Sequence, residues 1–243
     1  MSVNINGSKL ADIGRYINLK KRGDRKKYFL NQLVSAGITE VTRKAAIESE
    51  HGGVSGIIET TFELYKEFLE TGKDTMIVFE DDCKFLSTIK DNSKQICSDI
   101  ANTEWDIFWL GGCNRKPIRY IGNNCCQVSS INYAQSYIIS KNFAESLVAA
   151  FSTLDKQYVN IFDVHHAGID EVLCLYAYSK ELVRDAIPTG FYDLDQPLDK
   201  YKPKYRAVCY KEPLTTQVND TSDITHVETS LDEWLALPYN IEK

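Results

Sequence analysis

The sequence predicts an α/β protein built around a mostly parallel sheet that helices cover on both faces. Two apolar runs of strand length, residues 75–79 and 106–110, have the continuous hydrophobicity of strands that are buried on both sides. Strand signals and helical stripes alternate through the first half of the chain. Strands separated by helices imply right-handed crossovers and parallel pairing. Ligands of such sheets bind beyond the carboxyl ends of the strands, so the search for functional residues begins there.

The first third of the chain carries two strand signals and two helical stripes. Residues 15–19 predict a strand, and residues 20–24 a polar turn. A helix follows, and Gly37 is placed to end it in a left-handed conformation. Residues 38–41 predict a second strand, and the spacing of apolar residues predicts an amphipathic helix over residues 54–69. The apolar stripe of the first helix consists of Phe29, Leu30, Leu33 and Val34.

The rest of the chain adds a further strand and then becomes irregular. Residues 137–139 predict a strand, after which Ser140 is placed to cap a helix that runs through Ala150. Beyond residue 180 the patterns loosen, and we expect this segment to wrap back over the ligand-binding edge of the sheet. A separate domain is the alternative. The capping box in residues 230–233 predicts a short helix near the end of the sequence.

Composition narrows the class of protein. The chain has 243 residues, of which 43% are hydrophobic and 26% charged, and it carries a net charge of −6. These values exclude a disordered tail, a fibre and a coiled coil. The length suits a single domain spanning residues 1–243. The acidic balance argues against broad nucleic-acid binding, which requires a surplus of Lys and Arg, although a locally basic cleft stays open.

The start of the sequence and the cysteines indicate the cellular setting. Residues 1–12 lack the apolar core of a signal peptide, and no run approaches the length of a membrane span. We therefore expect a cytoplasmic protein, with peripheral attachment to a membrane surface left open. Seven cysteines without a CxxC pair indicate neither a disulfide framework nor a zinc knuckle, and we expect reduced, mostly buried thiols.

Three adjacent acids, Glu80, Asp81 and Asp82, follow the first buried strand. Neighbouring carboxylates repel one another, and partial desolvation adds to the cost unless a cation offsets it. Oxygen ligands suit Mg²⁺ and Mn²⁺, and such an ion can also bridge to a diphosphate. The alternative is that Asp81 or Asp82 caps a following helix while Glu80 is solvated.

The acidic segment resembles a motif of glycosyltransferase family 25, which includes lipooligosaccharide and collagen galactosyltransferases. The similarity rests on an ordered set of segments across nearly the whole chain. Two departures concern Ser55-Gly56, where the family shows Ser-His, and the stretch 184–210, which is longer than usual. The matching segments are 72–85, 16–19 with 22–25, 43–46, 105–112, 137–140, 168–170, and Pro213 with Gln217 and 222–224.

The resemblance implies a GT-A fold with a nucleotide-sugar donor of the UDP-hexose type, such as UDP-galactose or UDP-glucose, and a bound Mn²⁺ or Mg²⁺ ion. It implies inverting transfer, with residues 1–112 as the donor-binding half and residues 113–243 as the acceptor half with its C-terminal wrap. In this interpretation Asp82 is the metal ligand. Glu80 acts through the ribose or a metal-bound water, and Asp81 supports both.

Inverting transfer needs a base that deprotonates the acceptor hydroxyl, and a carboxylate can serve. Asp170 and Glu171 open an apolar run, which predicts a helix N-terminus beside the site. We expect Asp170 to be the base with Glu171 as the alternate; an acid stabilised by the helix dipole is the competing interpretation. His226 is a candidate metal ligand, as a C-terminal histidine often is in GT-A enzymes, or a surface histidine. His166 is a weaker candidate.

Residues after the first strand are candidates for nucleotide binding. Arg22 and Arg25, which follow Asn18 and Leu19, suit phosphate or base contacts, although this lysine-rich stretch could also be a solvated basic face. The glycine pair Gly111-Gly112 permits close approach of a ligand to the backbone. The sequence has neither a GxxxxGK[ST] nor a GxGxxG motif, which argues against P-loop kinases and dinucleotide-dependent dehydrogenases.

These features lead to one principal hypothesis and two alternatives. We expect a metal-dependent inverting glycosyltransferase whose partners are a nucleotide sugar and an oligosaccharide or other glycan acceptor. The acceptor could be a lipid-linked oligosaccharide, a bacterial surface-glycan precursor or a viral glycan. The same acids could serve a metal-dependent nucleotidyltransferase or phosphohydrolase. A catalytically silent module that binds nucleotides or glycans is the third hypothesis.

Overall fold

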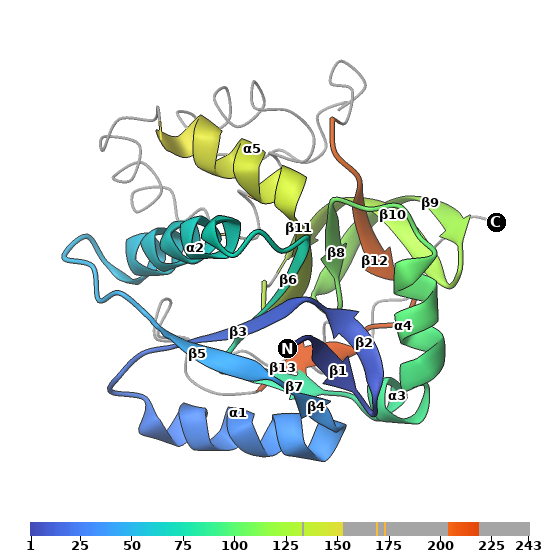
Figure 1. Cartoon of the computed structure of the whole chain (residues 1–243), viewed down its shortest axis with the longest axis horizontal. Coiled ribbons are helices and arrows are strands. Elements are labelled where there is room, and N and C mark those ends of the chain that lie inside the picture. The colour runs from blue at the N-terminus through green and yellow to red at the C-terminus, as the bar shows by residue number, and fades with distance from the viewer. Residues whose placement is uncertain (133, 153–168, 170–172, 174–203, 219–243) are drawn as a thin grey trace.

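The chain folds around a central eight-stranded sheet with helices on both faces (Figure 1). The computed structural model describes residues 1–132, 134–152, 169, 173 and 204–218. The strand order is β5-β3-β6-β11-β8-β12-β10-β9. The strands are β3 (Ile13–Asn18), β5 (Val41–Ala45), β6 (Thr75–Glu80), β8 (Ile107–Trp109), β9 (Cys113–Gly122), β10 (Cys125–Asn132), β11 (Ser136–Ser140) and β12 (Ala207–Tyr210).

The predicted α/β class and mostly parallel sheet are confirmed. Strands β5, β3 and β6 pair in parallel, as do β8 and β12. Strand β11 lies antiparallel between β6 and β8, and β10 lies antiparallel between β12 and β9. Six strands therefore run in one direction and two in the other. The carboxyl ends of β3 and β6 are neighbours, because Ile17 pairs with Glu80.

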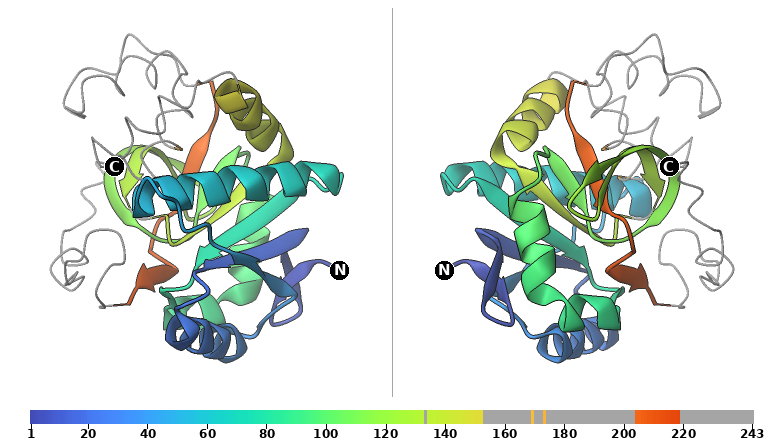
Figure 2. Two further views of the ribbon diagram at one scale, coloured as in Figure 1. Left: turned by 90° about the vertical axis from the view of Figure 1, so that its left-hand side faces the viewer. Right: turned by 90° about the vertical axis from the view of Figure 1, so that its right-hand side faces the viewer.

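The helices lie on opposite faces of this sheet (Figure 2). Two of them, α2 (Gly53–Glu70) and α5 (Lys141–Ser152), pack together on one face. On the other face lie α1 (Gly23–Ala36), α3 (Ser87–Asp91) and α4 (Ser93–Ala101). The faces have separate hydrophobic cores. The α2/α5 cluster includes Ile17, Val78, Trp109 and Leu147, and the α1/α4 cluster includes Phe29, Ile77, Phe79 and Ile100.

The predicted helices form as α1 and α2 in the first third of the chain and as α5 after Ser140. Gly37 ends α1 with a φ of 68°, and its amide donates to the carbonyl oxygens of Leu33 and Val34. Leu33 is buried, but Leu30 and Val34 are exposed, so the apolar stripe of α1 is only half covered. At α5, the amide of Phe143 donates to the side chain of Ser140 over 3.3 Å, which confirms the predicted cap.

The N-terminal segment forms strands that the polar composition did not predict. Strands β1 (Val3–Ile5) and β2 (Ser8–Ala11) make a hairpin, and β4 (Ile38–Thr39) pairs with β1. The predicted strand over 38–41 is thus divided: Glu40 adopts a φ of 64°, and the chain moves from the small sheet into the central one.

Residues 204–218 are the described part of the segment that was expected to wrap over the ligand-binding edge of the sheet. Strand β12 lies inside the central sheet between β8 and β10, so this part of the chain completes the sheet. The next strand, β13 (Thr215–Gln217), returns to the ligand-binding edge, where it pairs with β7 (Cys83–Phe85). The hairpin of β9 and β10 and the helices α3 and α4 were also not predicted. The capping box at residues 230–233 lies outside the described residues.

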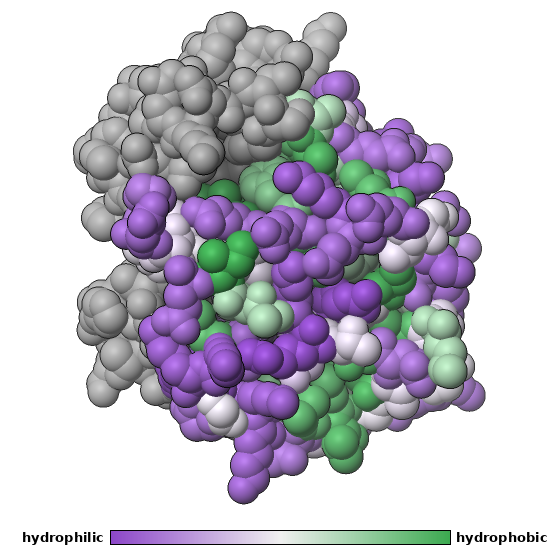
Figure 3. Space-filling model, turned by 60° about the vertical axis from the view of Figure 1, so that its left-hand side comes forward, coloured by the Kyte–Doolittle hydropathy of each residue, from purple (hydrophilic) through white to green (hydrophobic). Residues whose placement is uncertain are grey.

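The described surface is largely hydrophilic (Figure 3), and the described cysteine side chains are buried. Hydrophilic side chains cover much of the described surface, with smaller apolar groups between them (Figure 3). Within the described ranges, no helix combines the length and apolar character needed to cross a membrane. The five cysteines whose side chains are described are buried thiols: Cys83, Cys97, Cys125, Cys126 and Cys209.

Candidate functional site

Two buried carboxylates lie where β6 ends. Asp81 and Asp82 form the turn between β6 and β7, and their exposed fractions are only 7% and 6%. The amide of Glu80 donates to the carbonyl oxygen of Gln135 over 2.9 Å, which holds the end of β6 against the segment before β11. Because a strand and not a helix follows the turn, the interpretation of Asp81 or Asp82 as a helix cap is wrong.

Asn18 connects the end of β3 to this turn. Its Nδ2 donates to Oδ2 of Asp81 over 2.6 Å and to the carbonyl oxygen of Arg22 over 3.0 Å. Arg43 on β5 donates from Nε to Oδ1 of Asn18 and from NH2 to the Asn18 carbonyl oxygen, each over 2.9 Å. Arg43 therefore fixes the orientation of the buried amide, and the amide fixes Asp81.

Arg25 and Gln217 contact the carboxylates from opposite ends of the sequence. NH1 of Arg25, on α1, lies 3.5 Å from Oδ1 of Asp81 and 3.4 Å from Oδ2 of Asp82. Nε2 of Gln217, on β13, donates to Oδ2 of Asp82 over 2.7 Å. The guanidinium of Arg25 is thus within 3.5 Å of both buried carboxylates.

The electrostatic consequence falls on Asp81. Burial raises the pKa of Asp81 to about 6, and the charge of Asp82 adds to the rise. The hydrogen bond from Asn18 and the charge of Arg25 oppose it without cancelling it. An additional positive charge beside Asp81 would therefore stabilise its ionised form.

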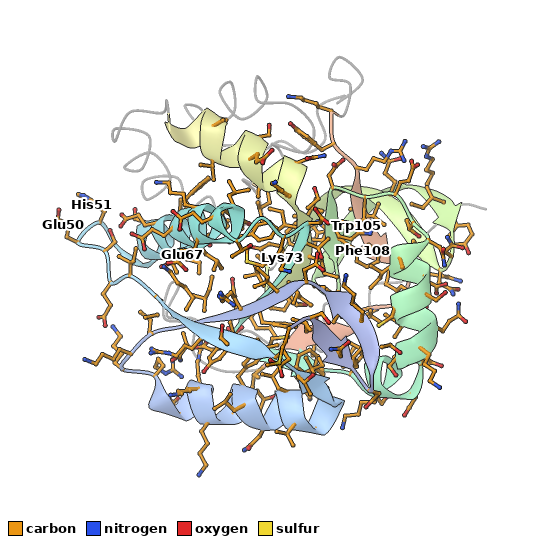
Figure 4. The ribbon with its side chains drawn as sticks, viewed as in Figure 1. Glu50, His51, Glu67, Lys73, Trp105 and Phe108 are labelled. Carbon is orange, nitrogen blue, oxygen red and sulfur yellow. The ribbon has the colours of Figure 1, made fainter. Side chains whose placement is uncertain are left out.

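A pocket of about 380 Å³ opens beside these acids. Its walls come from the ends of β3 and β6, the start of α1, the loop between β5 and α2, and the first turn of α2. Glu50 and His51 are at the tip of that loop and point outward (Figure 4). The lining residues are Ile17, Asn18, Leu19, Lys21, Arg25, Ala46, Ile47, Glu48, Ser49, Gly52, Gly53, Ile57, Glu80, Asp81, Asp82 and Gln217.

The carboxylates beside the pocket suit a divalent cation that prefers oxygen ligands. Among the described residues, no three His, Cys, Asp or Glu side chains are grouped to hold an ion by themselves. Two carboxylates facing a pocket nevertheless match Mg²⁺ and Mn²⁺ sites in which one or two carboxylates bind the ion and substrate phosphates and water complete its shell. The residues therefore fit an ion that arrives with a phosphorylated ligand, and Asp81 and Asp82 would hold it.

The structure brings together six of the residues that the sequence nominated. Asn18, Leu19, Arg25, Glu80, Asp81 and Asp82 all line the pocket. The other nominated residues divide into two groups. Arg22, Gly111 and Gly112 lie away from the lining, whereas Asp170, Glu171, His226 and His166 lie outside the described residues.

The three nominated residues away from the pocket have other surroundings. Arg22 forms an ion pair with the exposed Asp24, with NH2 and Oδ2 2.9 Å apart. A Cβ on Gly111 would lie 2.1 Å from Oγ1 of Thr215, so the space beside this glycine is filled by protein. Gly112 has a φ of 107°, which a residue with a side chain rarely adopts.

The Ser55-Gly56 departure has a structural reason. A Cβ on Gly56 would lie 2.5 Å from the carbonyl oxygen of Ile47. Thr60 holds this close approach, because its hydroxyl accepts a hydrogen bond from the Ile47 amide over 2.8 Å and donates to the Gly56 carbonyl oxygen over 2.6 Å. The pocket-lining loop therefore packs directly on α2, and a histidine at position 56 requires this loop to move.

Sequence reasoning did not assign roles to Arg43, Gln217 or the loop from Ala46 to Gly53. Arg43 and Gln217 are distant in sequence from the residues they contact, and only the pairing of β5 with β3 and of β13 with β7 brings them close. The loop carried one usable signal, because the pair Gly52-Gly53 precedes an amphipathic helix and leaves its N-terminus open.

Comparisons with known proteins add a remote likeness of fold. Neither the family models nor the curated proteins give a match. A glycosyltransferase involved in glycosylation of the major capsid of PBCV-1 is similar with a TM-score of 0.45 and 9% identity, over 87% of this chain and 95% of that one. The inositol-1-phosphate CTP transferase from T. maritima has a TM-score of 0.38 and 14% identity, over 93% and 77%.

Proposed function

We propose that this protein is a metal-dependent inverting glycosyltransferase. It transfers a hexose from a nucleotide sugar, with UDP-galactose and UDP-glucose as the first donors to test, to a hydroxyl group of a glycan acceptor. The proposal rests on one observation: the buried pair Asp81 and Asp82 faces a pocket, and burial raises the pKa of Asp81 to about 6. The ordered motifs of the sequence supply the choice of reaction.

The pocket offers complementary surroundings for a nucleoside diphosphate. Lys21 and Arg25 provide positive charge, and the N-terminus of α2 opens on the pocket at Gly52 and Gly53 without a side-chain cap. Backbone amides at a helix N-terminus attract phosphate groups. The apolar lining residues suit the face of a nucleobase; they are Ile17, Ala46, Ile47 and Ile57.

Each acidic residue has a proposed role in the reaction. A bound Mn²⁺ or Mg²⁺ would neutralise the diphosphate as it departs. Asp82 would hold the ion with Asp81 in support, and Glu80 would assist through the ribose or through a metal-bound water. His226 is proposed as a further ligand.

We propose Asp170 as the base that takes the proton of the acceptor hydroxyl, with Glu171 as the alternate. The residues directly before and after residues 170–172 in the sequence are described. Ile169 and Leu173 are buried in the α2/α5 cluster together with Ile17. The variant Asp170→Asn is expected to bind donor like the wild type and to lose transfer; unchanged kcat would remove Asp170 from this role.

The experiment is a donor screen whose readouts distinguish the proposed function from its alternatives. Purified protein is incubated with a panel of nucleotide sugars and Mn²⁺, with EDTA as control, and then with a glycan array. We expect slow hydrolysis of one donor, stimulated by Mn²⁺, and transfer to acceptors of one class. Exchange of pyrophosphate would indicate a nucleotidyltransferase, and release of phosphate a phosphohydrolase. Thermal stabilisation by a donor without turnover would indicate a silent binding module.

A further inference from the structure

Two cysteines from distant parts of the chain face each other across neighbouring strands. Strands β10 and β12 are antiparallel, and Cys126 is the direct partner of Cys209. The adjacent pairs, Cys125 with Tyr210 and Gln127 with Val208, continue the same register without a bulge. About 80 residues of sequence separate the two cysteines, so only the fold brings them together.

The two thiols lie on the same side of the sheet in a closed environment. Cys126 is fully buried and Cys209 is 5% exposed, and both belong to the α2/α5 cluster. Cys125 and Tyr210, one residue along, belong to the α1/α4 cluster on the opposite face. Facing residues of an antiparallel pair have Cα atoms about 4.5 or 5.5 Å apart, and both separations fall within the range that a disulfide spans.

We infer that Cys126 and Cys209 form a modification site at which a small peroxide closes an intrachain disulfide. One thiol reacts with hydrogen peroxide to give a sulfenic acid and a water molecule. The second thiol then displaces a second water from that sulfur as the S–S bond forms. Two thiols are oxidised and one peroxide is reduced to two waters, so atoms and electrons balance. A dithiol reductant reverses the reaction.

The bond has a defined structural consequence. It ties β12 to β10, and the chain that leaves β12 continues to β13, where Gln217 contacts Asp82. The disulfide therefore fixes β12, the strand that precedes β13 and its site residue Gln217. Burial raises the pKa of Cys126, although the charge of Lys211 opposes the rise, so oxidation of the folded protein is expected to be slow.

Peptide mapping of the full chain tests this inference. Protein treated with hydrogen peroxide, blocked with an alkylating reagent and digested with trypsin should yield peptide Tyr120–Lys141 joined to Ala207–Lys211. The joined peptide should disappear after treatment with dithiothreitol. Closing a loop of about 80 residues should raise the Tm of the oxidised protein by on the order of 10 °C.

Two variants identify the sulfur atoms. Cys125→Ala is the matched control, because Cys125 is equally buried but faces the opposite side of the sheet. The joined peptide should persist in Cys125→Ala and be absent from Cys126→Ala. If Cys126→Ala does not fold, the control and the wild type still decide. Loss of the joined peptide in Cys125→Ala, or its absence from peroxide-treated wild type, would overturn the inference.

Discussion

The described part of the chain contains two buried acidic regions that differ in their electrostatic surroundings. Asp99 on α4 is 4% exposed and accepts three hydrogen bonds of 2.8 to 2.9 Å, from Gln95, Asn124 and Tyr210. Asp81 and Asp82 are about equally buried, and NH1 of Arg25 lies 3.4 to 3.5 Å from both carboxylates. Only the second region borders the 380 Å³ pocket.

The pKa values of the two regions move in opposite directions. Burial opposes ionisation at Asp99, but its three hydrogen-bond donors together lower its pKa below the usual 3.8. At Asp81, burial outweighs the donors and raises the pKa to about 6. A buried acid that the protein satisfies stabilises the fold, whereas a buried acid that it leaves under-compensated beside a pocket is suited to bind a cation.

The largest expected effect comes from removing a carboxylate in each region. Asp82→Ala should reduce turnover about a thousandfold or more, because an ion at the departing diphosphate loses its ligand. Asp99→Asn should keep wild-type turnover in its folded fraction. Steady-state kinetics with Mn²⁺ measures both, and circular dichroism verifies the fold. Equal loss in the two variants would abolish the distinction between the regions.

The pH dependence of stability should separate the two acids by sign. In metal-free protein, Asp81 is destabilising when ionised, so its contribution to stability falls as the pH rises from about 4 to about 6. The contribution of Asp99 is complete above about pH 4 and is lost as the pH falls below it. Asp81→Asn should remove this decline in the free energy of unfolding, which amounts to at most about 3 kcal/mol. Denaturant unfolding in EDTA measures it; a parallel profile for wild type and Asp81→Asn would contradict the assignment.

A smaller effect is expected from removing one hydrogen-bond donor in each region. Asn18→Ala withdraws the 2.6 Å bond to Asp81 and should weaken affinity for a nucleotide sugar about tenfold. Tyr210→Phe withdraws the 2.9 Å bond to Asp99 and should cost about 1 to 2 kcal/mol of stability without changing that affinity. Calorimetry measures the nucleotide-sugar affinity of both variants, and denaturant unfolding measures their stability. An unchanged affinity in Asn18→Ala would count against the proposed site.

Much of the central sheet was predictable because its signals are local. The continuous apolar run of β6, the stripe of α2 and the Ser140 cap each lie within a few residues. The hairpin of β1 and β2 was missed although Asn6-Gly7, with φ values of 48° and 81°, is a strong turn signal. Strand β12 could not be placed, because its neighbours β8 and β10 are about 80 to 100 residues earlier.

The candidate site was predictable in its acids and not in its supports. Charge repulsion drew attention to the three adjacent acids Glu80, Asp81 and Asp82 from the sequence alone. The contacts of Arg43 with Asn18 and of Gln217 with Asp82 depend on strand pairing across the sheet and across the chain, which no local pattern encodes. Gly111 appeared open to a ligand in the sequence, whereas the fold places Thr215 against it.

The most direct test of the central claim is whether Mn²⁺ and UDP bind together at Asp82. Manganese binding is followed by electron paramagnetic resonance in the wild type, Asp82→Ala and Asp99→Asn, each with and without UDP. If Asp82 holds the ion, UDP should strengthen Mn²⁺ binding in the wild type and in Asp99→Asn and should have no such effect in Asp82→Ala. UDP-dependent Mn²⁺ binding that survives Asp82→Ala unchanged would contradict the account.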